Sequence, residues 1–156
     1  MITTIATILL FLTVTLGLGG GLYEILVIYP GWKHDVDPLT LRSKLQSSGQ
    51  ILAARRFWPI ASPAQVLLSI VSIVLAWKHK CEAQAWLLAA ALTVFVDRVI
   101  TFSYFIPVMI RKIMQPETIE APRLRKIVRQ WTMLSPIRVV LGLIVWIMLV
   151  IALMKI

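Results

Sequence analysis

Four ionisable residues interrupt long apolar stretches of the sequence: Glu24, Asp97, Arg98 and Arg138. Placing one such charge at the centre of a membrane-spanning helix costs about 2.5–3.5 kcal/mol, so these residues face a bundle interior or water and seek partners. Two acids and two bases sum to zero charge, which predicts that the four pair with one another. Two interpretations stay open, because the pairs can either fix helix packing or form a functional site.

Helical spacing predicts which side chains accompany these charges. On the first apolar stretch, Gly17, Gly20 and Gly21 share a helix face with Glu24. A small-residue stripe of this kind lets another helix approach closely. Two polar stripes lie on the third and fourth stretches: Asp97, Thr101 and Tyr104, then Trp131, Ser135, Arg138 and Gly142. We therefore expect three helices to contribute to one polar patch inside a bundle.

The composition of the 156 residues predicts that the chain resides in a membrane. Apolar residues make up 59% and charged residues 15%, against about 45–50% and about 25% in a soluble domain. The mean hydropathy is +0.86. Four stretches reach the ~20 apolar residues of a spanning helix: about 2–30, 59–77, 85–110 and 132–154. The predicted fold is all-α, a transmembrane four-helix bundle in a single domain over 1–156.

The connection between the first two spans is patterned. Asp37-Pro38 is typical of a helix start, and apolar residues then alternate with basic ones as far as Phe57. We expect an amphipathic interfacial helix over about 38–57, broken near 47–49, that lies on the membrane or covers the end of the bundle. Trp32, Phe57 and Trp58 are placed where an interfacial aromatic belt is expected.

Four prolines lie in the second, third and fourth predicted spans. Pro59 and Pro63 fall within the first turn or so of the second span, where a missing N–H group is tolerated. Pro107 and Pro136 lie inside the third and fourth spans. They should kink the helix and free a backbone carbonyl one turn earlier.

The 16 lysines and arginines exceed the 7 acids by nine, and their positions predict an orientation. Eleven bases fall in the connections 31–58 and 111–131, and three lie at the opposite ends of the spans. By the positive-inside rule we expect both connections to be cytoplasmic and both termini outside, in a bacterial inner membrane. Anionic lipid headgroups account for the excess charge. The expected partners are therefore membrane lipids and no nucleic acid, and association into a homo-oligomer stays open.

Motifs for metal-dependent or nucleophilic chemistry are not found in the sequence. His34 and His79 are expected on opposite sides of the membrane, and neither has a second ligand at helical spacing. Cys81 is the one cysteine, so no Cys-x-x-Cys pair exists. No phosphate-binding loop or nucleophile motif occurs either. We expect no metal site and no cofactor.

One whole-length resemblance adds to this reading. The first span ends in Tyr29-Pro30, and the last opens on Trp131-x-x-x-Ser135-x-x-Arg138. This layout resembles an integral-membrane domain-of-unknown-function family that includes the fungal anthrone oxygenases. Those proteins carry asparagines at the positions of Ser135 and Met109, while the chain keeps Pro107.

The resemblance implies oxygenation of an activated, phenol-like tricyclic substrate with no obvious metal or flavin. It implies Asp97 or Glu24 as the base that takes a proton from an acidic carbon. Arg98 or Arg138 is then the group that stabilises the anion, and Trp131 a stacking surface. Five aromatic or hydroxyl side chains are candidate ligand contacts: Tyr23, Thr101, Tyr104, Trp131 and Ser135. For the aromatic ones, packing in an interfacial belt or in the core is the alternative.

Three functions stay open at this point, and the sequence does not decide whether the protein is an enzyme. The first is binding of a lipophilic small molecule at the polar patch, with oxygenase-like activity. The second is a non-enzymatic scaffold or partner-binding protein whose intramembrane salt bridges are structural. The third is a transporter or channel, which four spans without a repeat make the weakest. A pocket of about 300 Å³ or more at the polar patch would favour the first.

Overall fold

A computed structural model describes residues 1–34, 38–78, 82–115 and 119–156 of the chain. Throughout these residues the ordered elements are helical, and no strand is found among them. The first span contains α1 (Ile2–Tyr23), the π-helical turn η1 (Glu24–Ile28) and α2 (Tyr29–His34). After α3 (Pro38–Ser47), the second span is α4 (Gln50–Lys78).

The third span is interrupted by wider turns, whereas the fourth is regular. It contains α5 (Gln84–Ile100), the π-helical turn η2 (Thr101–Phe105), the short α6 (Ile106–Val108) and a further π-helical turn, η3 (Met109–Ile113). The fourth span is α7 (Ala121–Lys155), a single helix.

Four of these helical stretches are long and apolar enough to cross a membrane, which confirms the predicted all-α four-span bundle. They run over Ile2–Trp32, Gln50–Lys78, Gln84–Ile113 and Ala121–Lys155. Each is longer than the apolar stretch that predicted it, because backbone hydrogen bonding continues through the polar residues at the helix ends. The largest differences are in the fourth span, which begins at Ala121 rather than near Thr132, and in the second, which begins at Gln50 rather than near Pro59.

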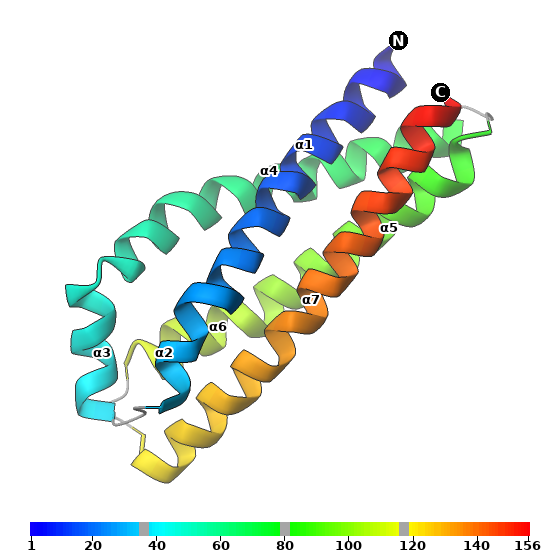
Figure 1. Cartoon of the computed structure of the whole chain (residues 1–156). Coiled ribbons are helices and arrows are strands. Elements are labelled where there is room, and N and C mark those ends of the chain that lie inside the picture. Colours follow the sequence, from blue (N-terminus) through cyan, green and yellow to red (C-terminus); the bar gives the residue numbers. More distant parts are fainter. Residues whose placement is uncertain (35–37, 79–81, 116–118) are drawn as a thin grey trace.

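The helices run antiparallel, so both termini lie at one end of the bundle and α3 lies at the other (Figure 1). The long helices contact one another in the cyclic order α1, α4, α5, α7. A closed arrangement of four helices leaves an interior that all four can line.

The segment 38–57 is divided into two parts. Gly49 has φ of +70° and separates α3 from α4, at the position where the sequence predicts a break. The first part covers the end of the bundle, because Leu41 and Leu45 are buried in its core. The second part is not a separate interfacial helix, since residues from Gln50 onward continue without interruption into the second span.

The prolines lie at several kinds of position in the helices. Pro59 and Pro63 lie well inside α4 rather than in its first turn, because α4 begins so much earlier. Pro136 lies inside α7, which continues past it as one helix. Pro107 lies between the π-helical turns η2 and η3, so the third span absorbs it by widening its turns.

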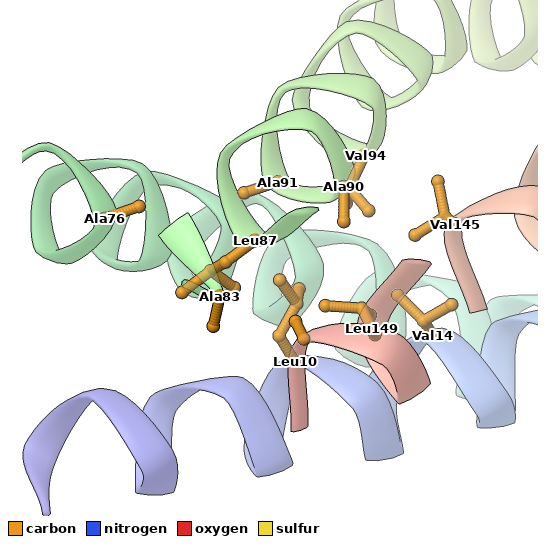
Figure 2. Close-up of a cluster of buried hydrophobic side chains, with 11 residues drawn as sticks. Leu10, Val14, Ala76, Ala83, Leu87, Ala90, Ala91, Val94, Val145 and Leu149 are labelled. Atoms are coloured by element: carbon orange, nitrogen blue, oxygen red, sulfur yellow. The ribbon is translucent and has the colours of Figure 1, made fainter. Parts of the chain in front are cut away.

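Two apolar clusters fill the ends of the bundle. The cluster near the termini, shown in Figure 2, joins all four long helices through residues such as Leu10, Leu87 and Leu149. It is rich in alanine, whose small side chain lets the helices approach closely. Such close packing holds helices together in lipid, where the hydrophobic effect does not. The second cluster, at the α3 end, is aromatic and includes Tyr29, Trp32 and Trp131 among its members. The predicted intramembrane charges lie on the helices between these clusters.

Candidate functional site

Asp97 on α5 is the centre of an ion-pair cluster. Its Oδ1 accepts a hydrogen bond from Nε of Arg138 on α7 at 3.1 Å. Its Oδ2 accepts from Nε of the neighbouring Arg98 at 3.0 Å and also from Nη2 of Arg98. One carboxylate thus neutralises one of two guanidinium groups, and the cluster keeps a net charge of +1.

Further contacts fix both arginines. Nη2 of Arg138 donates to Oγ1 of Thr101 at 2.8 Å, and that hydroxyl donates to the backbone carbonyl of Asp97 at 2.7 Å. The guanidinium carbon of Arg138 lies 4.4 Å from the centre of the Phe105 ring, as in a cation–π contact. Nη1 of Arg98 donates to Oγ of Ser62 on α4, at a longer 3.4 Å. The cluster therefore ties α4, α5 and α7 together.

Glu24 is held by neutral groups instead. Its Oε1 accepts from the indole Nε1 of Trp58 at 2.7 Å, and its Oε2 accepts from the hydroxyl of Tyr29 at 2.8 Å. Among the described residues, no lysine or arginine forms an ion pair with it. The predicted mutual pairing therefore holds for Asp97 and the two arginines and is wrong for Glu24.

The π-helical turn explains how Tyr29 reaches Glu24. In a regular α-helix a residue five positions on lies about 140° round the axis, since each residue turns by about 100°. In η1 the N–H of Tyr29 bonds to the carbonyl of Glu24, which widens the turn and brings the two residues onto one face. The tyrosine hydroxyl can then donate to the carboxylate along this shared face.

A cavity of about 70 Å³ lies between the two carboxylate sites. Polar side chains from all four long stretches line it: Glu24, Gln65, Asp97, Arg98, Ser135 and Arg138. Val14, Val94 and Val145 close it on the side of the alanine-rich cluster. A volume of this size holds a few water molecules and is well below the ~300 Å³ of a typical ligand pocket.

The predicted glycine stripe on α1 faces α4 and the cavity. A Cβ atom at Gly20 would lie 2.8 Å from the Phe57 ring, and one at Gly17 would overlap the Gln65 amide. That amide donates to the carbonyl of Thr13 at 2.6 Å, so α1 and α4 are in close contact here. The stripe therefore acts in helix packing, and its small size also leaves room for the cavity.

The remaining predicted ligand contacts occupy different environments. Thr101 and Ser135 are buried beside Arg138, although Thr101 does not line the cavity. Trp131 is buried in the aromatic cluster, where it stacks on Trp32 at 5.6 Å between ring centres. Tyr23 is 58% exposed and Tyr104 is 37% exposed, and both lie outside the cavity lining.

The sequence did not predict that four further residues lie at the charges or the cavity: Tyr29, Trp58, Ser62 and Gln65. The polar residues of α4 do carry a signal, because they recur at helical spacing through a span without charges and are buried: Ser62, Gln65, Ser69 and Ser72. Trp58 was expected in an interfacial belt, and only the packing of α4 against α1 turns its N–H toward Glu24.

The site can also be compared with metal centres and with known proteins. Across the described residues, no cluster of three or more metal-ligating side chains is found. Comparison with known protein families, with curated proteins and with solved structures finds no match. The chain is therefore described by its own geometry, as a four-span membrane protein with a polar layer between two apolar clusters.

Proposed function

We propose that this protein binds a lipophilic weak acid, such as a phenol or an enol, with the acidic edge of the molecule in the cavity. The observation that carries the proposal is the contrast between the two carboxylates that line it. Glu24 has only neutral hydrogen-bond donors, whereas Asp97 and its two arginines keep a net charge of +1. A base and an anion-stabilising group therefore share one cavity.

In this proposal the proton passes from the ligand to Glu24 within one cavity. When Glu24 takes the acidic proton, the ligand becomes the anion, and the negative charge stays close to the positive cluster. The total charge of the site does not change, which matters because separated charges are costly at low dielectric. Nε and Nη2 of Arg138 are engaged, and among the described residues Nη1 has no other partner. We assign it to the ligand anion as one of its donors.

The resemblance to the anthrone oxygenases supports a second step with dioxygen. An anthrone that has lost its acidic C–H proton to Glu24 is a carbanion, which dioxygen oxidises. A C–O bond forms as dioxygen adds at that carbon, and the resulting peroxide anion takes the proton back from Glu24. The O–O bond and the second C–H bond then break with loss of water, so that one anthrone and one dioxygen give one anthraquinone and one water, with dioxygen as the oxidant. In this proposal Glu24, rather than Asp97, is the base, because Asp97 is already bound by two guanidinium groups.

Anthrone turnover by the protein in lipid nanodiscs tests this function. We expect the wild-type protein to accelerate conversion of anthrone to anthraquinone in air over empty nanodiscs. Glu24→Gln should lower the rate at least ~100-fold, which is the usual contribution of a positioned base. Glu82→Gln is the matched control, because Glu82 is 81% exposed at the termini end and pairs with Lys155. Equal rates for Glu24→Gln and the wild type, or no acceleration by the wild type, would overturn the proposal.

A structural scaffold is the second candidate, and the saturated Asp97 cluster favours it. The Asp97 carboxylate joins the third and fourth spans, and Arg98, which it binds, reaches Ser62 on the second. Ion pairs of this kind can serve packing alone. On this account Glu24→Gln and Asp97→Asn both change stability, and neither changes a reaction. The anthrone assay with both variants separates the two candidates.

The orientation in the membrane is also a proposal. At the α3 end, exposed basic side chains lie on three elements: Arg55, Arg56, Arg111, Lys112, Arg123, Lys126 and Arg129. We assign this end to the cytoplasm of a bacterial inner membrane, which puts both termini outside. Alkaline phosphatase fused after Ile156 should then be active, whereas green fluorescent protein there should be dark. The reverse pattern would contradict this orientation.

A further inference from the structure

An apolar groove of about 430 Å³ lies between α4 and α5, separate from the polar cavity. Its walls come from both helices: Pro63, Val66, Leu67, Phe95, Val99 and Phe102, with Ser103 at the edge. Several of these side chains are exposed on the membrane-facing surface of the bundle. The volume falls within the ~300–1,000 Å³ of pockets that hold organic ligands, unlike the 70 Å³ of the cavity.

Ser62 and Arg98 lie on the boundary between the groove and the cavity. On α5, Asp97 and Arg98 line the cavity and Val99 lines the groove, so Arg98 lies at the edge of the cavity nearer to the groove. On α4, Ser62 has an intermediate position between the face of Gln65 and that of Val66. The hydrogen bond from Nη1 of Arg98 to Oγ of Ser62 therefore forms part of the partition, by which we mean the layer of side chains that separates the groove from the cavity.

This contact is the weakest part of the cluster. Its 3.4 Å length lies beyond the usual range of an N–H···O hydrogen bond. Arg98 holds Asp97 through Nε and Nη2, so its Nη1 can change acceptor while the ion pair stays intact. A ligand oxygen can thus replace the serine hydroxyl without exposing a charge to lipid.

We propose that the groove holds the apolar ring system of the lipophilic weak acid, and that its acidic edge reaches the cavity by displacing Ser62 from Arg98. The inference rests on the proposed function, since it concerns the same ligand. It resolves the size mismatch, because only the acidic edge has to fit the small cavity while the rings stay in the groove. The guanidinium group of Arg98 lies behind the apolar lining of the groove, at the edge of the cavity, and it favours an acidic aromatic molecule over an uncharged acyl chain.

Binding of 2-naphthol tests the groove independently of turnover. This compound is a planar, fluorescent weak acid without the acidic C–H bond of an anthrone. We expect saturable binding to the wild-type protein in nanodiscs, measured against empty nanodiscs. Val66→Phe fills the groove and should weaken binding at least tenfold. Val74→Phe is the matched control on the same helix, because Val74 is 46% exposed and lines neither space. It should bind as the wild type does.

Ser62→Ala tests the partition. The ligand no longer has to displace a hydrogen bond, so binding should tighten about threefold, as expected for one weak hydrogen bond. Unchanged binding in Val66→Phe, or no saturable binding to the wild type, would overturn the groove assignment whatever the anthrone assay gives. Loss of a co-purified phospholipid in Val66→Phe, with 2-naphthol binding unchanged, would assign the groove to an acyl chain. Groove-dependent binding without anthrone turnover would support the groove and refute the proposed chemistry.

Discussion

Glu24 and Asp97 line the same cavity, yet the protein holds them in different ways. Asp97 accepts hydrogen bonds from two guanidinium groups and connects three spans through them. Glu24 accepts one hydrogen bond from an indole and one from a phenol. Charges hold the carboxylate of Asp97, whereas neutral donors hold that of Glu24.

The contrast divides the polar layer into a structural part and a reactive part. Removing Asp97 leaves two arginines without their counter-charge inside the membrane, so it should affect stability first. Removing the charge of Glu24 breaks no ion pair among the described residues, so it should affect chemistry first. Four substitutions test this division, and they are ordered by the size of the expected effect.

Asp97→Asn should have the largest effect on stability. It breaks a buried pair and leaves Arg98 and Arg138 to repel each other, which costs about 3–5 kcal/mol when one partner of such a pair is removed. Thermal unfolding in detergent, followed by circular dichroism, measures the loss. A cost below about 1 kcal/mol, the size of an exposed ion pair, would show that the cluster is not structural.

The double variant Asp97→Asn with Arg138→Gln should recover about half of that loss. It removes one acid and one base together, so the layer returns to the net charge of the wild type. Coupling energies of about 0.5–3 kcal/mol are usual for residues in one network. The free energy of unfolding of both single variants and of the double variant gives the coupling. Simple additivity would contradict the assigned ion pair.

Trp58→Phe should cost about 1–2 kcal/mol, because it removes one hydrogen bond to a charged group and keeps an aromatic ring. The same variant should reduce anthrone turnover, since Glu24 then loses one of the two groups that orient it. Trp77→Phe is the control, as Trp77 is 75% exposed near the end of α4. Equal effects of the two substitutions on unfolding and turnover would remove Trp58 from the site.

Ser72→Ala should have the smallest effect and the opposite sign. Ser72 is fully buried, and its Oγ has no hydrogen-bond partner among the described residues. Removing an unsatisfied hydroxyl should leave stability unchanged or raise it by up to about 1 kcal/mol. Ser69→Ala is the comparison, because the Ser69 hydroxyl donates to the carbonyl of Val66. Destabilisation by Ser72→Ala beyond that of Ser69→Ala would indicate a bound partner at Ser72.

The sequence predicts much of this fold because hydrophobicity and helical spacing act locally. Four apolar stretches, the break at Gly49 and the polar positions of the third and fourth spans follow from composition and periodicity. The start of α4 at Gln50 could not be predicted in this way, because helix continuation past Trp58 depends on contacts with α1.

The candidate site is less predictable because it depends on how the helices are rotated against one another. The sequence places Glu24 among the intramembrane charges, but its partners are chosen by the π-helical turn and by the approach of Trp58. The same rotation turns Tyr23 outward although it lies next to Glu24. Charge balance alone predicted an ion pair for Glu24, and the neutral donors that replace it are invisible to a count of charges.

The most direct test of the division compares Glu24→Gln with Asp97→Asn in the same nanodiscs, with unfolding and anthrone turnover measured on each. We expect the free energy of unfolding of Glu24→Gln to lie within about 2 kcal/mol of that of the wild type, the scale of one charge-assisted hydrogen bond, while its turnover falls at least ~100-fold. We expect Asp97→Asn to lose at least about 3 kcal/mol of stability. If Glu24→Gln is destabilised as strongly as Asp97→Asn and turns over anthrone like the wild type, the central claim is contradicted.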